Sequence, residues 1–286
     1  MSNLKTRISW SLNNHCKAEC SYCPIHLRGG EEPRHITDYL TVTEKIINHY
    51  KNLGRTIDWT FNGGEPLDMF DFPQLIKLCK DNSGTIDLTT NGGKLWLDWW
   101  AIEPHVDTLR LSYHYWQNPK LIHFILDAFT VKNKTVDVMV PIRPDYFDED
   151  LSRALEIEKK YKFVVSKTAL YNHASQNGGL FPYTDQQLRI IRGEELIEEK
   201  NHFEETTFKE RVEEKIAVSP SFTNIPCNVG IETLNISHVG SVSGSNCNTL
   251  HLGNIWDVSF QLPNGPTPCR MIVCVDQNDQ QITKFT

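Results

Sequence analysis

The sequence contains no apolar run that approaches the roughly 18 residues needed to cross a bilayer, and its first residues form no apolar signal region. It also shows no internal repeat and no stretch of low complexity. With 286 residues, of which 39% are apolar, the chain can bury a sizeable core in one large domain or two. We therefore expect a globular protein without a membrane span.

The chain also lacks an even spread of charge. Its net charge is 29 − 36 = −7, and residues 194–214 alone hold nine Glu against three basic residues, a local balance of 3 − 9 = −6. The remaining chain is then close to neutral, at −1. Because a run of like charges is usually a solvated helix face, the acidic total says little about the substrate and does not exclude a polyanion.

Eight cysteines are present, but three of them, Cys16, Cys20 and Cys23, are too crowded for a disulfide framework. In a chain without a secretion signal, clustered cysteines favour a metal site in a reducing compartment, and we expect a cytoplasmic protein. Three thiolates cannot complete the ligands of a four-iron cubane, so one iron would stay open, which is typical of a catalytic centre. A zinc site completed by His15 or His26 is an alternative that the spacing leaves open.

Short segments of alternating apolar and polar residues are separated by longer segments with helical spacing. Strands are predicted near 6–12, 56–62, 84–90, 107–113, 135–141 and 162–167, and helices near 36–53, 72–81, 94–102, 117–130 and 148–160. Repeated strand–helix units imply an α/β fold, with a parallel sheet and right-handed crossovers. Cys79 lies on the apolar face of its predicted helix and is expected to pack in the core.

Polar or glycine-containing segments directly follow three of the predicted strands. Asn62-Gly63-Gly64-Glu65-Pro66 follows the second strand, Thr89-Thr90-Asn91-Gly92 the third, and Ser112-Tyr113-His114 the fourth. Glycines let a backbone approach a ligand closely, and a carboxylate suits an ammonium group. These segments and the cysteines all lie at the C-terminal ends of predicted strands.

With these segments in this order, residues 5 to about 167 resemble the radical S-adenosylmethionine (radical SAM) enzymes, whose C-x3-C-x2-C motif has an aromatic residue before the last cysteine, here Tyr22. The resemblance implies a partial (β/α)6 barrel of the TIM type and a [4Fe–4S] cluster on Cys16, Cys20 and Cys23. S-adenosylmethionine would bind the open iron and be cleaved reductively to a 5′-deoxyadenosyl radical, which abstracts a hydrogen atom from a substrate. The residues implied around this cosubstrate are Tyr22, Gly63, Gly64, Glu65, Thr90, Asn91 and Ser112, with the Glu65 carboxylate on its ammonium group.

The second half of the sequence changes character after about residue 168. We predict a barrel core over residues 1–168, a helical linker or insertion over 169–220 with helices near 184–200 and 203–217, and a small domain over 221–286. That last segment contains Cys227, Cys247, Cys269 and Cys274, with a β-hairpin predicted between the first two. Four thiolates suit one fully ligated cluster or a structural zinc ion.

The C-terminal segment resembles the shortened auxiliary-cluster domain, called twitch, of the SPASM branch of radical SAM enzymes. Residues 252–256, which read L-G-N-I-W, strengthen the match. The resemblance implies one auxiliary [4Fe–4S] cluster in a small domain of hairpin and helix, and no cysteine remains for a second auxiliary cluster. The spacing departs from the commoner pattern, since the terminal pair is C-x4-C rather than C-x2-C.

Side chains at predicted strand ends are candidates for the chemistry that follows hydrogen abstraction. His114, Arg143 and Tyr113 are predicted to bind substrate or move a proton, and Arg143 suits a carboxylate. Lys167, Tyr171 and His173 are further candidates. A fully ligated auxiliary cluster favours oxidation or bond formation, with redox-neutral isomerisation of an amino-acid-like or nucleobase substrate as the alternative. An alternative of a different class is a non-catalytic iron–sulfur or zinc module, which leaves the strand-end motifs unexplained.

The expected partners follow from the resemblance and from the position of the first strand. This strand begins near Thr6, which leaves no room before it for the winged-helix peptide-binding domain that peptide-modifying relatives usually carry. We therefore expect a small-molecule substrate, or a residue or base presented by a larger partner. The resemblance also implies a flavodoxin- or ferredoxin-type protein as the electron donor.

Overall fold

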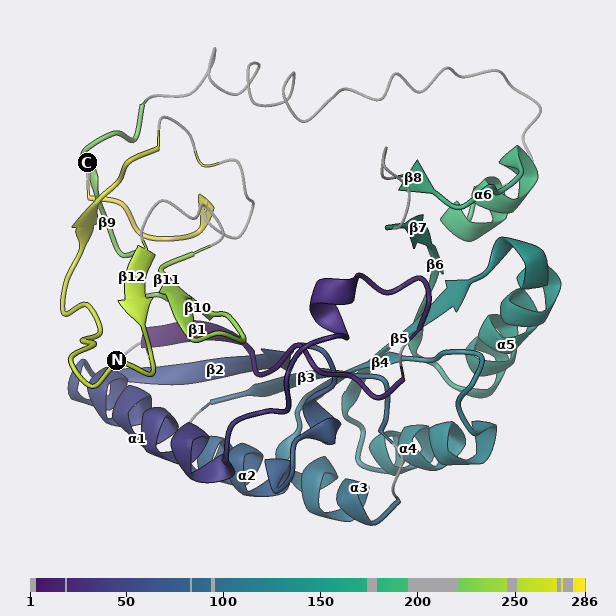
Figure 1. Ribbon diagram of the computed structural model, residues 1–286, viewed down its shortest axis with the longest axis horizontal. Helices are drawn as coiled ribbons and strands as arrows, with labels where there is room; N and C mark the ends of the chain where they lie inside the picture. The colour runs from purple at the N-terminus through teal and green to yellow at the C-terminus, as the bar shows by residue number, and fades with distance from the viewer. Residues whose placement is uncertain are drawn as a thin grey trace.

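The computed structural model describes residues 4–18, 20–82, 84–93, 96–173, 179–194, 221–245, 251–271, 274 and 280–285. Within these residues nine strands form one sheet, in the order β12-β11-β10-β1-β2-β3-β4-β5-β6. Strands β1 to β6 follow the order of the chain and pair in parallel. The helices that connect them lie along one side of the sheet (Figure 1). The predicted α/β fold is thereby confirmed, and it is consistent with a partial barrel of the TIM type.

The first half of the chain follows the predicted alternation. The strands are β1 (Leu4–Ser11), β2 (Arg55–Asn62), β3 (Ile86–Thr90), β4 (Thr108–Ser112), β5 (Thr135–Ile142) and β6 (Val164–Ala169), and the helices are α1 (Ile36–Asn52), α2 (Phe72–Asn82), α3 (Trp96–Ile102), α4 (Pro119–Val131) and α5 (Phe147–Lys160). Short 3-10 helices lie in the connections: η1 (Ile25–Leu27), η2 (Pro66–Asp68), η3 (Glu103–His105) and η4 (Pro144–Tyr146). Each predicted boundary lies within two residues of the observed one.

The side of the sheet that faces the helices forms the core. Successive strand residues point to opposite faces, so alternate residues of β1 and β2 are buried here, and Trp10, Trp59 and Phe61 are at most 1% exposed. The ring centroids of Trp10 and Trp59 are 6.3 Å apart, and those of Trp59 and Phe61 are 5.5 Å apart. Cys79 of α2 is fully buried in the same core, as its position on the helix predicted.

The opposite side of the sheet, which we call the inner face, is polar. The register places Thr89, Arg110 and Asp137 side by side on β3, β4 and β5. Ser112 and Met139 form a pair nearer the C-terminal ends of β4 and β5. The segment between β1 and α1, which carries the three clustered cysteines, lies on the side away from the helices (Figure 1).

The C-terminal strands extend the same sheet beyond β1. Strand β10 (Thr233–Ile236) pairs in parallel with β1, and β11 (Ser241–Ser243) and β12 (His251–Asn254) follow in antiparallel order. The hairpin predicted in this region is therefore present, and its buried residues belong to the main core: Leu234, Ile236 and Val242. The domain boundaries stay a prediction, although the hairpin shares both its sheet and its core with the barrel strands.

A second, smaller core lies beside the hairpin. It contains Cys227, Val229, Cys269 and Ile282, and the short strands β9 (Pro226–Cys227) and β13 (Thr267–Pro268) pair within it. Its two cysteines are therefore brought together by strand pairing across about forty residues of sequence, from 227 to 269.

After β6 the chain forms short strands β7 (Tyr171–Asn172) and β8 (Gly179–Leu180) and helix α6 (Asp185–Arg192). Helix α6 begins with a capping box between Thr184 and Gln187 and ends at Gly193, whose φ of 68° is left-handed. The helix predicted over 184–200 thus stops early, and the one predicted near 203–217 lies outside the described residues. In the described ranges, no helix is both long and apolar enough to traverse a membrane.

Candidate active site

The clustered cysteines lie on a compact loop after the C-terminal end of β1. Cys23 N donates to Cys20 O at 3.0 Å, and Arg28 Nε donates to Cys23 O at 3.0 Å, so the loop turns back on itself. Cys20 is buried, whereas Cys16 and Cys23 are partly exposed, and all three are free thiols. The loop therefore forms as the Cys spacing predicted.

The glycine segment after β2 packs against this cysteine loop. Gly64 N donates to Asn13 O at 2.8 Å, and Glu65 N donates to His15 O at 2.9 Å. A Cβ atom on Gly63 would lie 2.5 Å from Asn13 O, and one on Gly64 would lie 2.2 Å from His15 O. No side chain fits at such distances, and Gly63 also has a φ of 144°. The glycines thus allow the cysteine loop to approach, while the approach of a ligand stays a prediction.

Glu65 lies behind that segment and is only 1% exposed. Its carboxylate accepts hydrogen bonds from Thr90 Oγ1 at 2.5 Å, Asn91 N at 2.7 Å and Leu67 N at 2.9 Å. Burial raises the pKa of Glu65 to about 7, although these three hydrogen bonds favour the ionised form. The contacts hold the end of β3 against η2, and the predicted contact of Glu65 with an ammonium group stays a prediction.

We expect Glu65→Ala to lower the free energy of unfolding by roughly 3 kcal/mol, because it removes the acceptor of the buried Thr90 hydroxyl and of the partly buried Asn91 and Leu67 amides, and an unsatisfied buried donor costs about 1–3 kcal/mol. Glu65→Gln keeps one carbonyl oxygen and removes the buried carboxylate, so its effect should be smaller. Urea unfolding followed by circular dichroism, before iron loading, measures both variants. Equal stability of Glu65→Ala and the parent protein would show that these hydrogen bonds do not stabilise this end of the sheet.

Asn91 and Gln117 connect the ends of β3 and β4. Asn91 Nδ2 donates to Cys16 Sγ at 3.6 Å. The buried Gln117 amide donates to Asn91 O and accepts from His114 N. The T-N-G motif predicted Asn91 at this site, whereas Gln117 was missed because it lies in the connection before α4, where no motif marks it.

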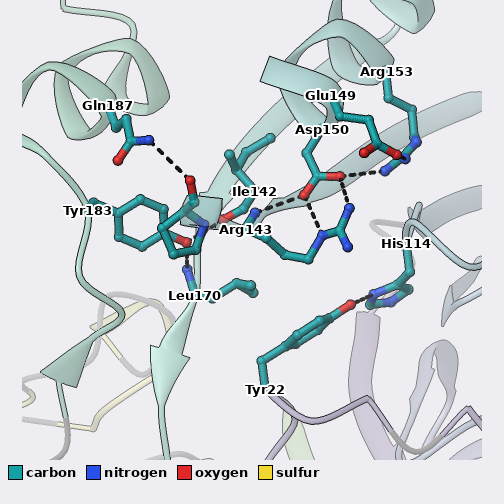
Figure 2. A network of polar contacts seen from close by, with 11 residues as sticks. Tyr22, His114, Ile142, Arg143, Glu149, Asp150, Arg153, Leu170, Tyr183 and Gln187 are labelled. Carbon is teal, nitrogen blue, oxygen red and sulfur yellow. Dashed lines mark hydrogen bonds and ion pairs between the residues drawn. The ribbon is translucent and has the colours of Figure 1, made fainter. Parts of the chain in front are cut away.

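Three aromatic rings stack beside Cys20. Tyr22 and Trp116 both stack on His114, with centroid distances of 5.9 and 5.7 Å. Tyr22 OH and His114 Nδ1 are 2.6 Å apart, as Figure 2 shows. Burial lowers the pKa of His114 to about 4, so the two groups share a hydrogen bond between neutral partners at pH 7. The predicted proton carrier is therefore an uncharged ring bonded to the cysteine loop.

Arg143 lies near this stack, but its charge is already paired. Its Nε and Nη2 donate to both oxygens of the buried Asp150 carboxylate, at 2.8 and 2.9 Å (Figure 2). The guanidinium carbon also lies 3.9 Å from the ring centroid of Tyr115 and 4.2 Å from that of Tyr146. The sequence predicted that the guanidinium N–H groups of Arg143 bind the carboxylate of a ligand. In the structure these groups instead donate to a carboxylate of the protein.

Other predicted side chains point away from the cysteine loop. Tyr113 is 3% exposed in the main core, where the Arg153 guanidinium lies 5.5 Å from its ring centroid. Because neighbouring strand positions alternate between faces, Ser112 lies on the inner face and Tyr113 does not, which corrects the prediction that Tyr113 contacts substrate. Thr90 is also buried, and Lys167 pairs with Glu158 of α5 at 2.5 Å.

The groups around the three cysteines fit thiolate ligands of a cluster. Two side-chain N–H donors are directed at their sulfur atoms, from Asn91 at 3.6 Å and from Trp116 at 3.1 Å. Burial raises the pKa of the Cys16 thiol to about 11, so a bound metal must displace its proton. Within the described ranges, no three His, Cys, Asp or Glu side chains lie close enough to share a single metal ion. The assignment of these thiolates to a cluster rather than to zinc stays a prediction.

Three of the four C-terminal cysteines are buried in the region of the second core. The thiols of Cys269 and Cys274 are close enough to raise the pKa of Cys227, although burial raises it more. Met271 N donates to Cys269 Sγ at 3.4 Å. Cys247 lies outside the described residues, so the four-cysteine ligand set stays a prediction.

No family model and no curated protein matches the chain. SuiB of Streptococcus suis is similar in structure, with 16% sequence identity and a TM-score of 0.53 over 89% of this chain and 64% of SuiB. SuiB bound to S-adenosylmethionine gives 16% identity and a TM-score of 0.51 over 92% of this chain and 63% of that one. The structure of anSMEcpe with bound AdoMet and the Cp18Cys peptide gives 15% identity and a TM-score of 0.50 over 89% of this chain and 78% of that one.

SuiB and anSMEcpe are radical SAM enzymes of the SPASM/twitch type. This chain spans less than two thirds of the length of SuiB, and the likeness is one of fold. It nevertheless extends over 89% of this chain. The chain therefore has the fold of the radical SAM enzymes of the SPASM/twitch type.

Proposed function

We propose that this protein is a radical SAM enzyme that cleaves S-adenosylmethionine with one electron, breaking a carbon–sulfur bond to yield methionine and a 5′-deoxyadenosyl radical. The observation that carries the proposal is the convergence of strand ends on one cysteine loop. Gly64 and Glu65 after β2 donate to its backbone, and Asn91 after β3 and Trp116 after β4 donate to its sulfur atoms. A non-catalytic cluster-binding module would not need the ends of three strands to meet at one cysteine loop.

Cys16, Cys20 and Cys23 would hold the cluster, which supplies an open iron and a low-potential electron to the cosubstrate. Asn91 lies beside this loop, because its amide donates to the Cys16 sulfur. Ser112 lies at the end of β4 on the inner face. A cosubstrate bound beside the loop would meet these two polar side chains first, whereas Glu65 and Thr90 would support them from behind.

The inner face favours a polar, amino-acid-like substrate, either free or within a peptide. Arg110 pairs with Asp87 at a long 3.5 Å and leaves 52% of its side chain exposed. Asp137, its neighbour in register, has no hydrogen-bond or ion-pair partner among the described residues. A substrate with a carboxylate and an ammonium or amide group would pair with both. In similar structures the bound molecules include the precursor peptide SuiA on SuiB and the Cp18Cys peptide on anSMEcpe.

We further propose an auxiliary [4Fe–4S] cluster on Cys227, Cys247, Cys269 and Cys274. Four thiolates would saturate this cluster, so the substrate would have no iron to bind there. Its role would be to accept the electron that the substrate radical releases, which makes the net reaction an oxidation or a bond formation. A flavodoxin- or ferredoxin-type protein would supply the electron that begins each cycle.

Anaerobic reconstitution with iron and sulfide, followed by S-adenosylmethionine and dithionite, tests the proposed activity. The iron-loaded protein should form 5′-deoxyadenosine and methionine in equal amounts. The same protein loaded with zinc should form neither, because zinc has no redox chemistry. Chromatography measures both products, and iron and sulfide analysis confirms the loading. A fully loaded protein that leaves S-adenosylmethionine intact would contradict the proposal.

A further inference from the structure

We propose that the indole N–H of Trp116 raises the reduction potential of the cluster held by Cys16, Cys20 and Cys23, by donating a hydrogen bond to the Cys20 thiolate. Trp116 Nε1 lies 3.1 Å from Cys20 Sγ. The inference rests on the proposed function, because it needs a cluster on these cysteines. It adds a residue outside the cysteine motif that controls how readily this cluster is reduced.

The position of the indole is determined by its neighbours. Its ring stacks on His114 with 5.7 Å between centroids and 11° between planes. His114 stacks in turn on Tyr22 and shares a 2.6 Å hydrogen bond with it. Gln117 accepts from His114 N and so anchors the same segment to β3. Because Tyr22 belongs to the cysteine loop, the stack keeps Trp116 in line with Cys20.

Cys20 is also the ligand at which a hydrogen bond has the largest effect. It is the buried member of the three, at 8% exposure. A hydrogen bond is electrostatically stronger in such a poorly solvated place than in water. The other sulfur-directed contact, from Asn91 to Cys16, is longer at 3.6 Å.

One-electron reduction adds a negative charge to the cluster and to its thiolate ligands. A donor directed at sulfur therefore stabilises the reduced form more than the oxidised form, and the potential rises. The indole is suited to this task because its N–H is a donor only and cannot replace the thiolate as an iron ligand. Trp116 would thus ease electron uptake from the donor protein while the cluster keeps enough driving force to cleave the cosubstrate.

Trp116→Phe tests the inference, since it keeps an aromatic ring to stack on His114 and removes the N–H. We expect iron loading equal to that of the parent protein and a cluster that is about tenfold harder to reduce, a negative shift of about 59 mV for one electron. Dithionite titration with redox mediators, followed by electron paramagnetic resonance, measures the midpoint potential. Only one of the two reduction steps should move, because the described C-terminal cysteines, Cys227, Cys269 and Cys274, are buried in the region of the second core. Trp100→Phe is the matched control, since this tryptophan on α3 is 68% exposed.

Trp116→Leu provides a second measurement, because it also removes the N–H and introduces no metal ligand. Its potential should be at least as low as that of Trp116→Phe. Unchanged potentials in both loaded variants would overturn the inference while leaving the proposed function intact, and so would an equal shift in Trp100→Phe. A parent protein that binds no cluster at these cysteines would instead overturn the proposed function.

Discussion

Replacing Cys16, Cys20 and Cys23 together with Ala should abolish the formation of 5′-deoxyadenosine. The reconstituted parent protein should hold about eight irons, from two four-iron clusters, and the triple variant about four. Without these thiolates no iron is left open for S-adenosylmethionine, since the remaining cysteines saturate their own cluster. Colorimetric iron analysis and chromatography of the reaction mixture measure the two effects on the same sample.

Cys79→Ala is the matched control for this triple variant. Cys79 is fully buried on α2, so its replacement removes a core thiol without touching a proposed ligand. It should retain about eight irons and full cleavage activity. Residual 5′-deoxyadenosine in the triple variant, above the level of a reaction without protein, would contradict the assignment of the cysteine loop as the reactive centre.

Replacing Cys269 and Cys274 with Ala should separate the two proposed clusters. The variant should lose about four irons, continue to form 5′-deoxyadenosine, and release no oxidised product, because the electron of the substrate radical has no acceptor. Normal product formation in a folded variant would defeat electron transfer through the auxiliary cluster. It would favour a redox-neutral isomerisation.

The structure predicts that this double variant keeps its main fold. Strand β10 pairs with β1, and Leu234 and Val242 pack in the main core rather than around the C-terminal cysteines. Among the described residues, the replaced thiol of Cys269 packs in the small core around Cys227. We therefore expect the cooperative thermal transition of the barrel to survive, and loss of that transition would show that the cluster is needed for folding.

The strands and helices of the first half were predictable from the sequence because their signals are local. An apolar residue at every second position, as in Ile57, Trp59 and Phe61, reports which face of a strand is buried without any knowledge of the fold. The cysteine loop was predictable for a similar reason, since three ligands within eight residues must lie near one another. The hairpin near Thr233–Ile236 was predicted by the same alternation.

The strand with which the hairpin pairs could not be predicted from such local signals. The parallel pairing of β10 with β1 joins residues more than two hundred positions apart, and no local pattern encodes such a partner. The sequence therefore indicated a separate small domain, whereas the structure shows a continuous sheet. The same limit applies to Gln117 and Trp116, whose roles depend on where β3 and the cysteine loop lie.

The sequence by itself determined the chemistry that is available: three crowded thiols, glycines where backbones must meet, and polar residues at successive strand ends. Spacing and side-chain type carry that information directly. Only the tertiary structure decided which contacts those groups make, because a contact depends on the direction of a side chain and on its distance from its partner. In the folded protein, Tyr113 is buried in the core, Arg143 pairs with Asp150, and Glu65 accepts hydrogen bonds from donors of the protein itself. It also placed an indole N–H on a cysteine sulfur, a contact 96 positions apart in sequence that only folding brings together.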